Sequence, residues 1–149
     1  MKLRVYLDTS VFSAYFDSRN LDRKSETEQF WKKLSLYDVS SSEIAKTEII
    51  KTSNAELRSK MLNLLAQVTV IPVTPEAENL AQRYLDADIF APTMRNDALH
   101  VAVAVMARQD ILLSWNFRHL VNRQRRALIN QLNISKSLPT IEIVAPPEV

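Results

Sequence analysis

Short apolar runs alternate along the chain with longer stretches in which apolar residues recur every three or four positions. The short runs predict strands at residues 3–7, 37–41, 68–73, 110–114 and 140–146. The longer stretches predict helices at residues 10–16, 24–35, 43–52, 54–66, 74–87, 96–107 and 118–132. Strands separated by helices are typical of an α/β fold, so we expect a three-layer α/β/α architecture with a central, mostly parallel sheet of about five strands. No repeat or linker interrupts the pattern, and residues 1–149 are expected to form one domain.

One predicted helix, NDALHVAVAVMA at residues 96–107, is apolar on every side. A helix of this kind belongs in the middle of a domain. It nevertheless carries Asp97 in its first turn and His100 one turn later on the same side. A single histidine in such surroundings is usually a hydrogen-bonded core residue, and we expect this of His100. Asp97 either caps the helix as a first-turn acid or belongs to a functional site.

The composition excludes several kinds of site. The chain contains no cysteine, which excludes disulfides, thiolate zinc sites and cysteine nucleophiles. It also contains no glycine, so the glycine-rich loops that cradle nucleotide phosphates are not expected. No apolar run is long enough for a membrane helix, and the N-terminus lacks a signal-peptide pattern. We therefore expect a cytoplasmic protein with no membrane association.

Positive charge gathers in one segment, although the net charge of the whole chain is only +2. The segment RHLVNRQRR, at residues 118–126, contains four arginines and a histidine. These residues are Arg118, His119, Arg123, Arg125 and Arg126. A run of charge on a helix is either a solvated face or a contact for the phosphates of a nucleic acid.

Three acids stand out by their position. Asp8 directly follows the first predicted strand, where it either caps the next helix or points into the crevice beyond the strand ends. Glu48 falls, at ~100° per residue, inside the apolar arc of its helix, whereas Glu43 lies on the polar side. Together with Asp97 these acids have no obvious buried cation to neutralise them. Because clustered carboxylates repel one another, a divalent ion would stabilise them, and their oxygen ligands suit Mg²⁺ or Mn²⁺.

In order and spacing, four segments of the chain resemble the PIN domain, in particular the VapC-like ribonucleases. The segments are YLDTSVF, TEII, NDALHVAVA and LLSWNFRHL, and the resemblance extends from Arg4 to the last predicted strand. It implies a parallel sheet flanked by helices and an endonuclease that cuts RNA with Mg²⁺ or Mn²⁺. For VapC-like proteins it also implies an antitoxin partner and a homodimer.

The resemblance assigns roles to individual residues. The acids that would hold the metal and act in catalysis are Asp8, Glu48 and Asp97. The small hydroxyl residues that would order the site are Thr9, Ser10 and Ser114. Asn116, a further expected catalytic residue, stands where many PIN domains carry another Asp. An amide oxygen can still orient water but brings no charge, so a second metal ion would bind more weakly there.

The expected reaction is metal-assisted hydrolysis of a phosphodiester bond. Direct attack by water is favoured, because no covalent nucleophile is evident. The four arginines of residues 118–126 would hold the RNA backbone. His119 either contacts a phosphate or lies on the surface without a role.

Two alternatives remain open from the sequence. In the first, the chain is a PIN-like protein that binds RNA or a protein partner without cutting, an alternative supported by Asn116. In the second, Asp8 is the covalent nucleophile of a small α/β hydrolase or phosphatase. Against the second, Ser10 replaces the second Asp of a phosphatase DxD pattern, and a serine hydrolase would need glycines that the chain lacks.

Overall fold

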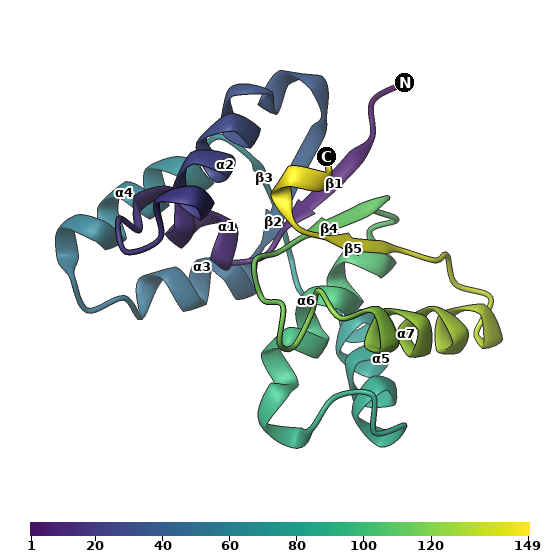
Figure 1. The fold of residues 1–149 in the computed structure, drawn as a ribbon. Helices are drawn as coiled ribbons and strands as arrows, with labels where there is room; N and C mark the ends of the chain where they lie inside the picture. Colours follow the sequence, from purple (N-terminus) through teal and green to yellow (C-terminus); the bar gives the residue numbers. More distant parts are fainter.

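Five short parallel strands form the centre of the computed structural model, which describes residues 1–149 (Figure 1). The strands are β1 (Arg4–Leu7), β2 (Asp38–Ser42), β3 (Thr69–Ile71), β4 (Ile111–Leu113) and β5 (Glu142–Val144). Their order in the sheet is β3-β2-β1-β4-β5, and every neighbouring pair is parallel. The predicted fold class is therefore confirmed. The chain winds outward in both directions from β1 and β4, which makes the gap between these two strands the topological switch point.

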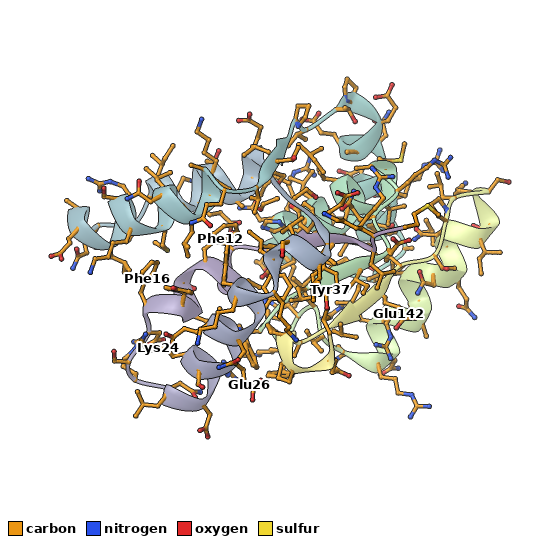
Figure 2. All side chains as sticks on the ribbon, turned by 90° about the horizontal axis from the view of Figure 1, so that it is seen from above. Phe12, Phe16, Lys24, Glu26, Tyr37 and Glu142 are labelled. Carbon is orange, nitrogen blue, oxygen red and sulfur yellow. The ribbon has the colours of Figure 1, made fainter.

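Seven α-helices cover the two faces of the sheet (Figure 1). They are α1 (Ser10–Ser13), α2 (Leu21–Lys32), α3 (Glu43–Ile50), α4 (Ala55–Leu65), α5 (Pro75–Asp86), α6 (Arg95–Met106) and α7 (Arg123–Ser135). Four 3₁₀ turns complete the structure, at Ala14–Phe16, Leu34–Leu36, Pro92–Met94 and Pro146–Glu148. Helices α1 to α4 lie on one side of the sheet and α5 to α7 on the other. In the first group Glu26 lies on the outside of α2, whereas Phe12 lies between the helices (Figure 2).

Two apolar cores lie on the two faces of the sheet, and β1 contributes to both of them. Val5 and Leu7 point into the core beneath α1, α2 and α4, whereas Tyr6 points into the core beneath α5, α6 and α7. This alternation is the period of two that a strand buried on both faces imposes. Helix α6 supplies seven buried residues, including His100, as its all-round apolar sequence predicts.

Two helices begin at residues other than those predicted, because capping side chains set their first turns. Helix α2 begins at Leu21, not residue 24, because the Asn20 side chain accepts a hydrogen bond from the Arg23 N–H. The basic helix begins at Arg123, not residue 118, because Asn122 caps it in the same way. The predicted helix over residues 10–16 is one α-turn followed by a 3₁₀ turn. Ser42 caps α3, and its side chain accepts a hydrogen bond from the Ile44 N–H.

The absence of glycine is visible at three helix ends. Asp88, Arg108 and Ser137 have φ of 59°, 55° and 58° in the turns after α5, α6 and α7. Each turn closes with a backbone bond from the next residue back to the last helical turn, such as Leu138 N–H to Asn133 O at 2.8 Å. Residues with a Cβ are strained in this left-handed conformation.

Glycine is therefore expected to stabilise the fold at one of these ends. Ser137→Gly should raise the free energy of unfolding by roughly 0.5–1 kcal/mol, because it relieves left-handed strain. Ser59→Gly, the same exchange at an exposed position inside α4, should lower it by about 0.5 kcal/mol. Urea denaturation of both variants measures the change in the free energy of unfolding. A change of the same sign in both would contradict the left-handed strain at Ser137.

No helix combines the length and the apolar character that crossing a bilayer demands.

Candidate active site

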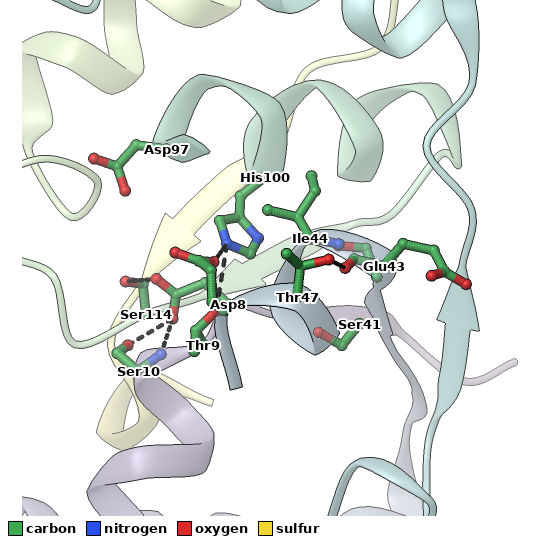
Figure 3. Close-up of polar contacts among 12 residues, drawn as sticks. Asp8, Thr9, Ser10, Ser41, Glu43, Ile44, Thr47, Asp97, His100 and Ser114 are labelled. Carbon is green, nitrogen blue, oxygen red and sulfur yellow. Dashed lines mark hydrogen bonds and ion pairs between the residues drawn. The ribbon is translucent and has the colours of Figure 1, made fainter. Parts of the chain in front are cut away.

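Asp8 lies at the switch point of the sheet, between the carboxyl ends of β1 and β4. Its N–H donates to Leu113 O at 3.1 Å, which extends the pairing of the two strands by one residue. Its Oδ1 accepts hydrogen bonds from the N–H and the hydroxyl of Ser10, at 3.1 and 2.5 Å. Its Oδ2 accepts from the Ser114 hydroxyl at 2.7 Å (Figure 3). Ser10 and Ser114 thus orient the carboxylate from two different strand ends.

The electrostatic environment of Asp8 is unusual for an acid. Its residue is only 5% exposed, and its carboxylate forms no ion pair. Burial raises the pKa of Asp8, although the nearby His100 and the hydroxyls of Ser10 and Ser114 oppose that shift. A buried carboxylate bonded only by neutral groups is an arrangement that a bound cation would stabilise.

Glu48 lies on α3 with its carboxylate held between two partners. Its Oε1 accepts a hydrogen bond from the Thr9 hydroxyl at 2.7 Å, and the same oxygen lies 2.6 Å from His100 Nε2. Burial alone would raise the pKa of Glu48, but the hydrogen bond and charge of His100, with the Thr9 hydroxyl, hold that pKa below its ordinary value. Glu48 is therefore ionised and His100 Nε2 donates to it.

A buried hydrogen-bonded chain extends from Glu48 into the core. His100 Nδ1 lies 2.7 Å from the Tyr6 hydroxyl, which in turn lies 2.7 Å from Ser42 Oγ. Ser42 Oγ also accepts the N–H of Ile44 at the start of α3. Because Nε2 donates to Glu48, Nδ1 is the ring nitrogen that shares a hydrogen bond with the Tyr6 hydroxyl. The chain thus joins β1, β2, α3 and α6 at one point.

His100 is both the core residue that the sequence predicted and a partner of the site. Sequence reasoning missed Tyr6 and Ser42 as its partners. The available signal was a phenol in the middle of a strand that is otherwise aliphatic, since a buried tyrosine hydroxyl needs a partner.

Asp97 lies in the first turn of α6, near the same end of the sheet (Figure 3). The cap of α6 is Met94, so Asp97 is not the capping residue. Its Oδ2 lies 3.0 Å from His119 Nδ1, and both side chains are partly exposed. Two of the three acids are therefore paired with a histidine. Glu48 and Asp97 each have a histidine as their partner, and neither bonds a lysine or an arginine, whereas Asp8 is bonded only by serine groups.

The three acids do not form one closed cluster. No three of the His, Asp and Glu side chains come close enough together to hold a metal ion between them. The physical reason lies in the two histidines, which hold Glu48 and Asp97 toward themselves.

Asn116 shapes the turn between β4 and α7. Its N–H donates to Ser114 Oγ at 2.9 Å, and its side-chain Oδ1 accepts the His119 N–H at 2.9 Å. Its backbone oxygen accepts from Leu120 and Val121. The amide of Asn116 therefore maintains the turn that carries His119 toward Asp97.

The predicted RNA-binding arginines fall into two groups. Arg125 donates to the backbone oxygens of Ile89, Arg118 and His119 and lies over the Phe90 ring. Arg126 donates to Ile143 O and approaches Glu142. Both guanidinium groups are thus occupied by the fold, which does not favour the expected phosphate contact. Arg118 and Arg123 are exposed.

A groove of about 230 Å³ runs between α3 and α6 beside the site. Its lining includes Thr47, Lys51 and Asn96. It leads along the helix that carries Glu48 to the helix that carries Asp97.

Comparison with known protein families identifies the family of this chain. A model of the PIN domain matches residues 5–139. The chain belongs to the PIN domain family. The resemblance predicted from the four segments is confirmed, and the match includes Asp8, Glu48 and Asp97 within its bounds.

Solved structures with the same fold include several VapBC and VapC proteins at low sequence identity. The DNA-bound VapBC of Salmonella typhimurium has a TM-score of 0.58 at 17% identity, over 97% of this PIN domain chain and 98% of that chain. VapBC2 of Rickettsia felis, bound to a promoter DNA fragment, has a TM-score of 0.56 at 13% identity, over 95% of this chain and 97% of that chain. VapC20 of Mycobacterium tuberculosis is described as a toxin that cleaves the sarcin-ricin loop. It has a TM-score of 0.57 at 18% identity, over 72% of this chain and 86% of that chain. No curated protein matches the sequence.

Proposed function

We propose that this PIN domain is a divalent-metal-dependent endoribonuclease that hydrolyses phosphodiester bonds. The observation that carries the proposal is Asp8, a buried carboxylate without an ion-pair partner at the switch point of the sheet. Ligand sites of open α/β sheets lie beyond the carboxyl ends of the strands at this point. The structurally similar VapC20 is described as a toxin that cleaves the sarcin-ricin loop, which supports a nuclease activity here.

The residues at the site fit Mg²⁺ or Mn²⁺ by their chemistry. Asp8 and Asp97 offer hard carboxylate oxygens, with no thiol and no competing lysine or arginine bonded to either acid. Asp97 Oδ1 has no hydrogen-bond partner in the protein, and Glu48 would contribute directly or through water. When bound, a divalent ion supplies Lewis acidity toward a phosphoryl oxygen.

The protein's own groups divide the remaining work. Ser10 and Ser114 hold both oxygens of Asp8 in a fixed orientation. His100 and Thr9 orient the carboxylate of Glu48 at the edge of the site. The exposed Arg118 and Arg123, with His119, would contact backbone phosphates without reading sequence.

An antitoxin partner and a homodimer form part of the proposal. The structural neighbours from Salmonella typhimurium and Rickettsia felis are VapBC complexes, in which a second protein accompanies the toxin. Mixing the chain with the product of an adjacent gene and measuring the mass of the complex by light scattering would test both features.

Cleavage should depend on the metal. Cleavage of a labelled single-stranded RNA should fall to background in excess EDTA and return when Mn²⁺ or Mg²⁺ exceeds the chelator, because no lysine or arginine near Asp8 replaces the cation. A denaturing gel over a metal titration measures this. Ca²⁺, of larger radius and looser geometry, serves as the control. Undiminished cutting in EDTA would contradict the metal role.

A second candidate function has support from specific contacts. Asn116 is committed to a turn, and two of the three acids are paired with histidines, which suits a PIN domain that binds RNA without cutting. RNA binding without cleavage at every metal concentration in the same titration would favour it. The covalent alternative is disfavoured because both oxygens of Asp8 accept hydrogen bonds and the residue is almost wholly buried.

A further inference from the structure

An arginine and two aromatic rings form a small surface next to the site, which we name the aromatic lip: Arg23, Trp115 and Phe117. The Arg23 guanidinium lies 5.4 Å from the centre of the Trp115 ring and 5.3 Å from that of Phe117. The two rings meet edge to face at 6.0 Å. Arg23 therefore lies against both rings, within the range of a cation–π contact.

The lip is built on hydrogen bonds that fix its parts. The Trp115 indole N–H donates to the Thr27 hydroxyl at 2.8 Å, and that hydroxyl donates to the backbone oxygen of Arg23 at 2.6 Å. Trp115 is 8% exposed, so it serves as the buried base of the lip. These bonds place one turn of α2 directly over the segment that follows β4.

The segment after β4 is also linked to Asp8 through the hydroxyls of two serines, Ser10 and Ser114. The Trp115 N–H donates to Ser10 Oγ at 2.8 Å, and the Asn116 N–H donates to Ser114 Oγ at 2.9 Å. Each of these hydroxyls donates to one oxygen of Asp8. Phe117 is the next residue, so the lip lies beside the carboxylate on which cleavage is proposed to depend.

Packing accounts for Trp115 but leaves two groups of the lip open. Phe117 remains 48% exposed although its backbone is well held. The Arg23 guanidinium forms no hydrogen bond and no ion pair with another residue. Asp17 has its pKa lowered chiefly by hydrogen bonds to Arg19, with a smaller effect of Arg23, and it is bonded to Arg19. The lip thus offers a half-exposed aromatic side chain and an unpaired positive charge together.

A half-exposed aromatic side chain beside an unpaired guanidinium matches the chemistry of an unpaired nucleotide. A base stacks on the ring, and its phosphate is attracted by the cation. The exposed Arg118 follows Phe117 directly and adds charge of the same sign. A base within a duplex is stacked on both sides and cannot offer a free face.

We propose that the aromatic lip stacks one unpaired base of a single-stranded RNA segment and so positions the neighbouring phosphodiester bond at Asp8. The inference rests on the proposed function and names its substrate class: RNA with an unpaired base at or next to the cut. Phe117 and Arg23 are positioning residues in this scheme.

Binding of a short labelled single-stranded RNA by the full chain, in EDTA so that the RNA stays intact, tests the proposal. Phe117→Leu keeps an apolar side chain but removes the ring face, and should weaken binding by about 5- to 30-fold. Phe117→Tyr should bind like the parent. A scan of single abasic nucleotides should find one position where loss of the base weakens parent binding by a similar factor, and that dependence should vanish in Phe117→Leu. Fluorescence anisotropy supplies the dissociation constants.

Charge alone is controlled by two arginine variants. Arg23→Gln should weaken binding by several-fold, whereas Arg83→Gln, which removes one exposed charge from α5 on the opposite layer, should not. If both variants weakened RNA binding equally, Arg23 would contribute only non-specific electrostatic attraction to the RNA, and its role as a positioning residue would be overturned.

The outcomes for the lip and for the nuclease are distinguishable. Cleavage of RNA with the same affinity and kcat/KM in Phe117→Leu as in the parent overturns the lip and leaves the nuclease proposal standing, with Phe117 then free for a protein contact. Base-dependent binding without cleavage supports the lip and removes the nuclease proposal. No binding of single-stranded RNA at low salt, or equal binding of its duplex, overturns the lip.

Discussion

Asp8→Asn is expected to lower the rate of RNA cleavage by at least about 10³-fold while the fold persists. The variant keeps the shape of the side chain and an oxygen that can accept from Ser10, but it loses the charge that a cation needs. A loss of about 4 kcal/mol of transition-state stabilisation corresponds to about three orders of magnitude in rate. Single-turnover cleavage at saturating Mn²⁺ measures the effect, with circular dichroism as the check on folding.

The same substitution should stabilise the protein. Burial raises the pKa of Asp8 above its ordinary value of 3.8, so ionising this carboxyl costs more in the folded state than in the unfolded one. The associated stability is fully present below that ordinary value and is lost as pH rises through the folded-state pKa. Asn carries no such cost, so in EDTA at pH 7 the variant should have a Tm higher by roughly 2–6 °C, and the difference should shrink toward pH 4.

Asp88→Asn is the matched control for both measurements. Asp88 is exposed and has a left-handed backbone that Asn adopts equally well, so neither rate nor Tm should change. A variant at position 8 that cuts RNA at the parent rate would remove Asp8 from the mechanism. A lower Tm in that variant at pH 7 would show that its hydrogen bonds outweigh the cost of its charge.

The architecture was predictable because it depends on patterns that repeat over many residues. The run Leu3–Leu7 and the alternation with helices led to a parallel sheet, and Asp8 at the end of its strand led to the switch point. Helix α6 was predicted as central because its apolar residues circle the axis. Element ends were less predictable, because the apolar pattern alone does not show which residue caps a helix, as at Asn20 and Asn122.

The partners of the site residues could not be predicted from spacing. Glu48 and His100 are 52 residues apart, and whether they touch depends on how α3 packs on α6. The same holds for Asp97 and His119, 22 residues apart. Arg125 illustrates the converse: its charge suggested a phosphate contact, but backbone oxygens at three positions already occupy its guanidinium. Which groups a long side chain meets is a property of tertiary packing.

The two histidine pairs lead to the second large expected effect, which is on stability. His100→Ala should lower the free energy of unfolding by about 2–4 kcal/mol, because it leaves a cavity in the core and removes a partner from the Tyr6 hydroxyl. His119→Ala should cost at most about 1 kcal/mol, because its pair with Asp97 is partly exposed to solvent. Urea denaturation of both variants gives the comparison.

The buried hydrogen-bonded chain from Ser42 to Glu48 allows a more specific prediction than the difference in burial between His100 and His119. Burial raises the pKa of Tyr6 well above its ordinary value, so its hydroxyl keeps its proton throughout the working pH range. Tyr6→Phe should therefore cost roughly 1–3 kcal/mol although it removes a single oxygen atom, since the buried His100 Nδ1 loses its hydrogen-bond partner. The double variant with His100→Ala should cost less than the sum of the two, because both act on one hydrogen bond. Strict additivity, or equal losses for His100→Ala and His119→Ala, would mean that the chain from Ser42 to Glu48 does not act as a unit, and that His100 stabilises the fold only by the volume it fills.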